Sequence, residues 1–335
     1  MVHRTTILVG LLTACSCASP DPGFGDEMEW VHDPSRLVTE DGHPVLYSSG
    51  AEGVALRRAR VDLEASTVTP LPGLMADGLT DGWWQEVQEW NPTGEFDAPT
   101  LSDDGQWLAF TVFDEQDEDI RDVTAVARRD GEGWMPAQIV LESFGEDSET
   151  PRAMDASFLS SDDALHLVFG SHAGGIYLTS LDAETGMLNE TPDTPDTTLE
   201  SDRFMLLADD RERGIEAPYL HAHDGWYYLF VNKGQCCMGT SSTYAIVVGR
   251  SKDLFGPYID KNDVDLRDGG GTTFLDTEGR FIGPGHVGIQ TFDGDAYLGF
   301  HFYDADDNGR AKYALHDLSW SDEGWPVLGD LRVAQ

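Results

Sequence analysis

Short apolar stretches alternate with Gly, Asp and Pro along the whole chain, a pattern that is typical of β-strands joined by tight turns. No long segment has the 3.6-residue period of an amphipathic helix. The clearest predicted strands cover residues 107–112, 124–129, 176–181, 226–232, 244–250 and 312–318. The sequence therefore predicts an all-β protein.

One motif recurs five times: a segment with an acid or a histidine, then an Asp-led turn, then an apolar strand. The copies read HDPSRL before DGHPVLYSS, FDAPTL before DGQWLAFTV, AMDASFL before DDALHLVFG, IEAPYL before DGWYYLFVN, and GPGHVGI before DGDAYLGFH. Their turn aspartates are Asp41, Asp104, Asp162, Asp224 and Asp293, which lie 63, 58, 62 and 69 residues apart. A period of this length with several short strands per unit is typical of propeller blades. We predict a five-bladed β-propeller.

Each copy carries an acid or a histidine seven or eight residues before its turn aspartate. These residues are Asp33, Asp97, Asp155, Glu216 and His286. If they hold equivalent places in the innermost strands, all five side chains converge on the central channel. Desolvating a carboxylate at an inward position costs free energy and does not help folding. We therefore predict that this ring is a functional site.

Two carboxyl groups that face each other across a channel suit glycoside hydrolysis. One must be protonated to release the leaving oxygen, and the other must be ionised to activate water. An ionised Asp155 near Glu216 would help to keep the glutamate protonated at neutral pH, because like charges disfavour each other. His286 could orient a hydrated cation or hydrogen-bond a carboxylate.

Several segments between residues 213 and 327 resemble the endo-arabinanase branch of glycoside hydrolase family 43. They are IEAPYL, GWYYLFVNKGQCCMGTSSTYAIVVGRSKDLFGPY, GGGTTFL, GPGHVGI and YDADDNGRAKY. The resemblance implies a five-bladed propeller that cleaves α-1,5-linked arabinan, or a related arabinose-containing polysaccharide, with inversion. It implies that Asp33 in HDPS is the general base and Glu216 in IEAP the general acid. It also implies that Asp155 in RAMD modulates the acid and contacts the substrate.

The same resemblance implies further site residues. His286 in GPGH is expected at a channel metal, which in the family is usually Ca²⁺ held mostly through water, and no organic cofactor is expected. The stretch LVFGSHAGGIYLTSLDAETG places Ser171 and His172 at the substrate cleft, where His32 is expected as well. Asp97 stands where the family has the Trp of Trp-Ala-Pro, and it is either a further cleft acid that contacts substrate or a structural residue of the blade.

The N-terminus has a basic start, an apolar run over residues 7–12, and then Leu12-Thr13-Ala14-Cys15, which resembles a bacterial lipoprotein signal. The apolar run is too short to span a bilayer. We predict a signal peptide at 1–14, lipidation of Cys15, a tether at 15–27 and the propeller at 28–335. The alternative is an ordinary secretory signal that is cleaved near Ala18. Either way the protein is expected to be exported, as a cell-envelope lipoprotein or as a secreted protein.

The formal net charge of −40 opposes binding to nucleic acid or to an anionic bilayer. Contact with a membrane is therefore expected only through the N-terminal lipid anchor. We expect a monomer whose partner is a neutral polysaccharide or oligosaccharide.

Three alternative functions fit parts of the sequence. An exo-acting arabinofuranosidase or β-xylosidase would share the fold and the acids and differ in its loops. A lipoprotein that binds glycans without cleaving them is indicated by two departures from the family pattern: Ala156-Ser157 replaces Pro-Asn, and His172-Ala173 replaces a cleft tryptophan. A structural assembly propeller is suggested by the strand pattern of residues 98–110.

Overall fold

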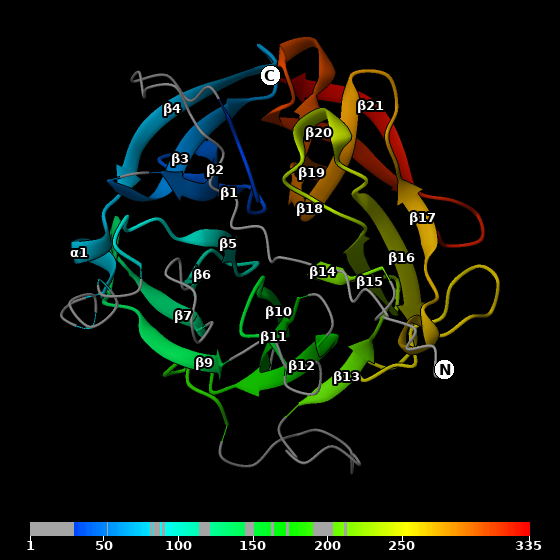
Figure 1. Cartoon of the computed structure of the whole chain (residues 1–335), viewed down its shortest axis with the longest axis horizontal. Coiled ribbons are helices and arrows are strands. Elements are labelled where there is room, and N and C mark those ends of the chain that lie inside the picture. Colours follow the sequence, from blue (N-terminus) through cyan, green and yellow to red (C-terminus); the bar gives the residue numbers. More distant parts are fainter. Residues whose placement is uncertain are drawn as a thin grey trace, which may run out of the picture.

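The computed structural model describes residues 30–335 except for 52, 81–82, 84–87, 89–90, 114–120, 145–150, 162–163, 172–173, 190–203 and 211–212. Its strands form five sheets around a central axis, so the predicted five-bladed β-propeller is confirmed (Figure 1). The predicted signal peptide, Cys15 and the tether lie outside the described residues. Within the described part of the chain, no helix has the length and apolarity needed to cross a membrane.

Each blade is an antiparallel sheet whose strands follow one another from the channel outward. Blade 1 has β1 (Val38–Glu40), β2 (His43–Ala51), β3 (Val54–Asp62) and β4 (Thr67–Leu74). Blade 2 has β5 (Asp97–Leu101), β6 (Trp107–Phe113), β7 (Arg121–Asp130) and β9 (Gln138–Phe144), and the short β8 (Gly133–Trp134) also pairs with β7. Blade 3 has β10 (Ser157–Ser161), β11 (Ala164–Phe169), β12 (Ile176–Leu181) and β13 (Met205–Ala208).

Blade 4 has β14 (Ile215–His223), β15 (Trp226–Lys233), β16 (Ala245–Ser251) and β17 (Thr272–Leu275). Blade 5 has β18 (Phe281–Phe292), β19 (Asp295–Asp304), β20 (Arg310–Trp320) and β21 (Pro326–Ala334). A short helix, α1 (Ala76–Thr80), lies between blades 1 and 2. Single 3₁₀ turns cover Gly239–Ser241, Leu266–Asp268 and Ala305–Asp307. All six strands that the sequence predicted most clearly are formed, with ends that differ by a few residues.

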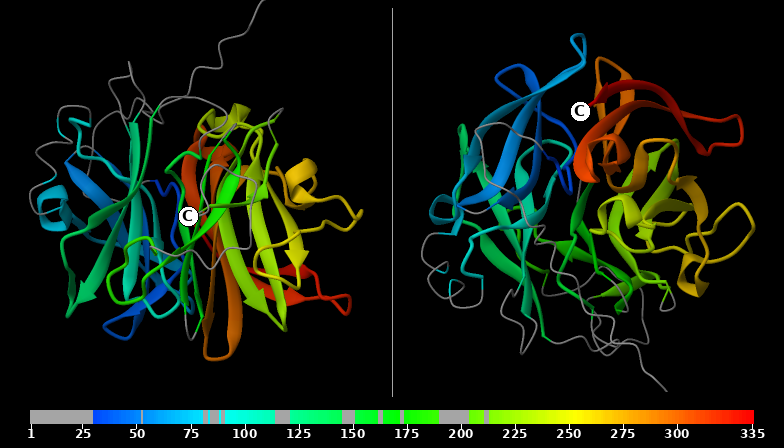
Figure 2. Two further views of the ribbon diagram at one scale, coloured as in Figure 1. Left: turned by 90° about the horizontal axis from the view of Figure 1, so that it is seen from below. Right: turned by 45° about the horizontal axis from the view of Figure 1, so that its top comes forward.

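Five apolar clusters fill the five spaces between neighbouring blades. Both faces of a blade are therefore covered, which explains why β6 and β12 are almost continuously apolar. The fifth cluster closes the ring by packing Tyr313 of blade 5 against Leu46 of blade 1. The N–H of Val31 adds a backbone hydrogen bond to Ala311 at 2.9 Å. Figure 2 shows these first and last blades standing side by side.

A cation–π clasp, formed by Arg250, Trp226 and Trp325, joins blades 4 and 5. The guanidinium of Arg250 lies 4.3 Å from the ring centroids of Trp226 in β15 and of Trp325 in the β20–β21 turn. It also donates hydrogen bonds to the carbonyl oxygens of Glu323 and Gly324 at 2.7 and 2.9 Å. Trp226 therefore has a structural role.

Candidate active site

The innermost segment of each blade contains one non-glycine residue in the left-handed conformation at the channel. These residues are Asp33, Ala98, Asp155, Ala217 and His286, with φ between 46° and 60°. Asp97 and Glu216 stand one residue before the left-handed position of their blades. The prediction that all five ring members hold equivalent places is therefore wrong for these two. The left-handed residue stands six to eight positions before the turn aspartate in different blades, so sequence spacing could not fix the register.

The backbone N–H of each left-handed residue donates a hydrogen bond toward the preceding blade. Four of the bonds run from Ala98 to Ser49 Oγ, from Asp155 to Thr111 Oγ1, from His286 to Asn232 Oδ1 and from Asp33 to His301 Nδ1, at 3.0 to 3.2 Å. The four acceptors hold matching places in the second strands of their blades, seven or eight residues after the turn aspartates. We call these bonds the interblade latch, and they fix the backbone around the channel.

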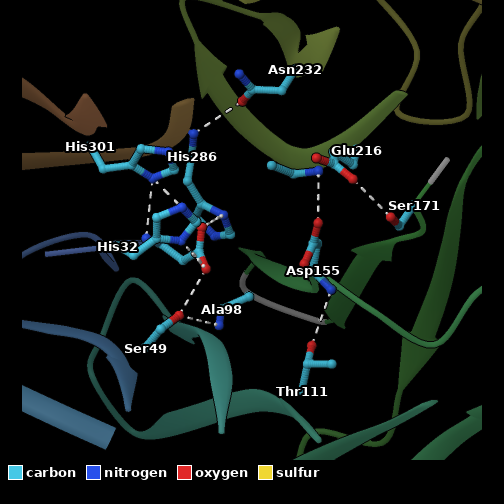
Figure 3. A network of polar contacts seen from close by, with 12 residues as sticks. His32, Ser49, Ala98, Thr111, Asp155, Ser171, Glu216, Asn232, His286 and His301 are labelled. Carbon is cyan, nitrogen blue, oxygen red and sulfur yellow. Dashed lines mark hydrogen bonds and ion pairs between the residues drawn. The ribbon is translucent and has the colours of Figure 1, made fainter. Parts of the chain in front are cut away.

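The latch between blades 3 and 4 has a different acceptor. The matching position in blade 3 is Gly170, whose φ is 127° and where an added Cβ would overlap the carbonyl oxygen of Gly175. With no side chain there, the N–H of Ala217 donates to Oδ2 of Asp155 at 3.2 Å (Figure 3). This bond holds the carboxyl group of Asp155 beside the residue that follows Glu216.

The carboxyl group of Asp33 is held by three side chains. Oδ2 lies 2.8 Å from Nδ1 of His32 and accepts a hydrogen bond from Ser49 Oγ at 2.8 Å, while Oδ1 lies 3.3 Å from Nδ1 of His286. Burial opposes ionisation, but the charges of His32 and His286 outweigh it and hold the pKa of Asp33 well below its usual range. Asp33 is therefore an oriented, ionised hydrogen-bond acceptor over a wide pH range.

Glu216 and Asp155 form the second half of the cluster. Glu216 is 7% exposed, and its Oε2 accepts a hydrogen bond from Ser171 Oγ at 3.0 Å. Burial, and then the negative charge of Glu216, raise the pKa of Asp155 to about 7. The two buried carboxyl groups therefore do not both ionise freely below neutral pH.

Asp97 joins the cluster from the start of β5. Burial, followed by the charge of Asp33, raises the pKa of Asp97 to about 7. Ser49 connects the start of β5 to Asp33, because its Oγ accepts from the N–H of Ala98 and donates to Oδ2 of Asp33.

The structure brings together seven of the predicted site residues: His32, Asp33, Asp97, Asp155, Ser171, Glu216 and His286 (Figure 3 labels most of them). His172 lies outside the described residues. Sequence reasoning missed Ser49 and His301, which hold the backbone and the side chain of Asp33. Their signal was present, because each is a polar residue eight positions after a turn aspartate.

Among the described residues, one group of side chains has donors close enough to share a metal ion: His32, Asp33 and His301, within 4.8 Å of one another. Both ring nitrogens of His32 already face Asp33 and Tyr303, at 2.8 Å each, and Nδ1 of His301 accepts from the N–H of Asp33. Two imidazoles and one carboxylate do not provide the oxygen ligands that Ca²⁺ requires. The donors do not fit directly bound calcium, and an ion held through water near His286 stays a prediction.

A buried group of carboxyl and imidazole side chains at the channel of a five-bladed propeller defines this protein as a candidate glycosidase. The model of the glycosyl hydrolases family 43 matches residues 80–326. The chain belongs to this family and is a glycoside hydrolase.

Individual relatives agree with this assignment. The chain is 36% identical over 201 residues to the extracellular exo-α-(1→5)-L-arabinofuranosidase ArbA of Cellvibrio japonicus, a match that covers 59% of this chain and 57% of that protein. It is 29% identical over 329 residues to the extracellular endo-α-(1→5)-L-arabinanase 1 of Bacillus subtilis, covering 96% and 94%. Among solved structures, a family 43 endo-arabinanase from Bacillus licheniformis superposes with a TM-score of 0.73 at 30% identity, covering 89% of this chain and 97% of that one.

Proposed function

We propose that this protein hydrolyses α-1,5-linked arabinan, or a related arabinose-containing polysaccharide, with inversion of configuration. The observation that carries the proposal is the buried cluster of Asp33, Asp155 and Glu216 at the channel of a family 43 propeller. The substrate is supported by relatives named as arabinanases, of which the Bacillus subtilis protein aligns over 96% of this chain.

Asp33 is the general base in this proposal. The pKa of Asp33 is held low by His32 and His286, so the carboxylate is ionised and its two oxygens are oriented. It accepts a proton from water as the water oxygen attacks the anomeric carbon. Ser49 keeps Oδ2 in place through its hydrogen bond.

Glu216 is the general acid. Its proton passes to the leaving oxygen, O5 of the neighbouring arabinose, as the glycosidic bond breaks. Asp155 modulates this step, because the bond from Ala217 holds it near Glu216 and the two buried carboxyl groups disfavour each other's ionisation, so that the pair retains a proton. Water therefore adds from one side of the sugar while the leaving group departs from the other, which inverts the configuration.

The proposed substrate contacts follow from the positions of the remaining cleft residues. His32 and Asp97 lie beside the base, and Ser171 lies beside the acid. We also propose His172 as a substrate contact, on the sequence pattern alone. Export is supported by the relatives that are named extracellular; lipidation at Cys15 and a monomeric state rest on the sequence.

An exo-acting arabinofuranosidase is the second candidate function. The specific observation in its favour is the 36% identity to ArbA of Cellvibrio japonicus, which is named as exo-acting. A non-catalytic glycan-binding lipoprotein is not favoured, because the chain belongs to a hydrolase family and Asp33, Asp155 and Glu216 are all present in the cluster.

Hydrolysis of debranched arabinan tests the proposal, with products resolved by size for the wild type, Glu216→Gln and Asp33→Asn. We expect oligosaccharides from the wild type and a loss of turnover of at least about 100-fold in both variants. Arabinose as the sole product would favour the exo-acting function. Unchanged turnover in Glu216→Gln would contradict the proposed role of the glutamate.

A further inference from the structure

We propose that Arg152 and Asp122 are positioning residues for Asp155. Their buried ion pair fixes the segment 152–155 against blade 2, and this sets where the carboxyl group of Asp155 lies relative to Glu216. The inference rests on the proposed role of Asp155 in hydrolysis. It assigns a purpose to an ion pair that the catalytic scheme does not use.

The ion pair joins two buried side chains of different blades. Asp122 lies in β7 of blade 2, and the side chains of Arg152 and Asp122 are 11% and 1% exposed. Nε and Nη2 of Arg152 both donate to Oδ2 of Asp122, at 2.9 and 2.8 Å. The hydroxyl of Ser143 in β9 donates to the same oxygen at 3.3 Å. The start of the segment that leads to Asp155 is therefore tied to β7 and β9 of the preceding blade.

The next residue, Ala153, continues this anchor through its backbone. Its N–H donates a hydrogen bond to Oγ of Ser143 at 3.0 Å, and its carbonyl oxygen accepts one from Oγ1 of Thr124 at 2.9 Å. Ser143 thus contacts both Asp122 and Ala153. The ion pair and the backbone bonds form one network, so a change at Arg152 is transmitted to the residues that follow.

The last two residues of the segment are held as well. The carbonyl oxygen of Met154 accepts a hydrogen bond from the N–H of Gly170 at 2.9 Å. The N–H of Asp155 donates to Oγ1 of Thr111 at 3.1 Å, which is the latch of this junction (Figure 3). Each of the four residues from Arg152 to Asp155 therefore contacts a neighbouring strand, and the carboxyl group stands at the end of a fixed piece of backbone.

Stability alone does not explain this ion pair. The desolvation of two charges offsets much of their attraction, and a well-packed apolar pair often serves folding equally well. A guanidinium that places two donors on one carboxylate oxygen does, however, restrict the geometry of both side chains. Such restriction matters at Asp155, because a displacement of about 1 Å at a reacting site can lower the rate about 100-fold.

The test is a double-mutant cycle on kcat for arabinohexaose. Arg152→Met should lower kcat by about 10- to 100-fold in the wild type. In the Asp155→Asn background, whose residual turnover is measured at high enzyme concentration, it should change kcat by less than about twofold. Arg121→Met is the matched control, because Arg121 forms a partly exposed ion pair with Glu142 on the same two strands, and it should keep wild-type kcat.

Two results would overturn the proposal. One is wild-type kcat in folded Arg152→Met. The other is a loss by the same factor with and without the carboxyl group of Asp155, because a merely structural role does not act through that group.

A second variant covers the case in which Arg152→Met does not fold. Asp122→Asn/Arg152→Met leaves no unpaired charge in the interior and should show the same loss of kcat and the same dependence on Asp155; wild-type kcat would overturn the proposal equally. Asp155→Asn alone separates the two levels. If it retains wild-type turnover, the proposed role of Asp155 fails; if it is impaired while the Arg152 variants are not, only the positioning role fails.

Discussion

The backbone N–H of Ala217 donates a hydrogen bond to Oδ2 of Asp155, 3.2 Å away, across the junction of blades 3 and 4. At the other four junctions the equivalent N–H binds a second-strand side chain of the preceding blade. Gly170 removes that possibility here, so a carboxyl group of the candidate active site also completes the interblade latch. Asp155 therefore connects the closure of the propeller to the proposed chemistry.

Replacing Asp155 should separate its two roles. At pH 5, Asp155→Ala should lower the free energy of unfolding by about 1 to 2 kcal/mol, because the N–H of Ala217 loses its acceptor. Asp155→Asn keeps an amide oxygen and should be close to wild type in urea unfolding. Both variants should lose turnover by at least about 100-fold. Equal stabilities of the two variants would contradict the role of Asp155 in the latch.

Asp97 should make the fold less stable as the pH rises. Its pKa is about 7 in the folded protein, raised by burial and then by the charge of Asp33, against about 3.9 in an unfolded chain. The unfolded state therefore loses this proton first, and stability falls between pH 4 and pH 7 and levels off above.

As the pH rises from 4.5 to 8, the free energy of unfolding of Asp97→Asn should increase by about 1 to 3 kcal/mol relative to that of the wild type, since one unit of pKa difference corresponds to about 1.4 kcal/mol. Urea unfolding at the two pH values measures the gain. Asp322→Asn, at an exposed position, is the control and should show no such gain. If the free energies of unfolding of Asp97→Asn and the wild type differed by the same amount at both pH values, Asp97 would not retain its proton in the folded state.

His286 should set the acidic limb of the activity profile. Although burial opposes ionisation of Asp33, the charges of His32 and then His286 lower the pKa of Asp33, and the proposed base must be ionised to act. His286→Gln should therefore move the acidic limb of kcat/KM upward by about one pH unit. His316→Gln, on β20 with Nδ1 3.1 Å from the Gly329 carbonyl, should leave the limb in place. If the acidic limb of His286→Gln did not move, His286 would not be a residue that lowers the pKa of Asp33.

The clasp around Arg250 should contribute to stability without affecting catalysis. Arg250→Ala removes one stacking contact within blade 4, and one stacking contact and two hydrogen bonds to blade 5, so the free energy of unfolding should fall by about 2 kcal/mol. Arg332→Ala, which removes an exposed ion pair with Asp317, should cause a much smaller change. A large loss of kcat/KM in Arg250→Ala would contradict the separation of the clasp from the site.

The repeat of turn aspartates predicted the number of blades correctly because a tight turn joins the first strand of a blade to its buried second strand. The inward acids at Asp33, Asp155 and Glu216 were recognisable for a similar reason, since a buried carboxyl group has little use in folding. The one-residue offset of Glu216 and Asp97 was not predictable. It depends on where each innermost segment adopts its left-handed residue, and sequence spacing does not fix that position.

The contacts that cross between blades were also beyond sequence reasoning. The approach of His301 to Asp33 joins residues 268 positions apart, and that of Ser171 to Glu216 joins residues 45 apart. Such pairs are set by how the blades pack against one another. The same packing explains Gly285, which looks like an ordinary turn glycine until the ring of Tyr244 is placed against it.

The central claim is that Asp33 and Glu216 act from opposite sides of the scissile bond, and the anomeric configuration of the first product tests it most directly. Proton NMR during the first minutes of arabinohexaose hydrolysis separates the newly formed anomer from later mutarotation. The account predicts that the wild type releases the β-anomer from the α-linked substrate and that Glu216→Gln releases no detectable product. Initial release of the α-anomer would contradict the inverting mechanism and the roles given to both residues.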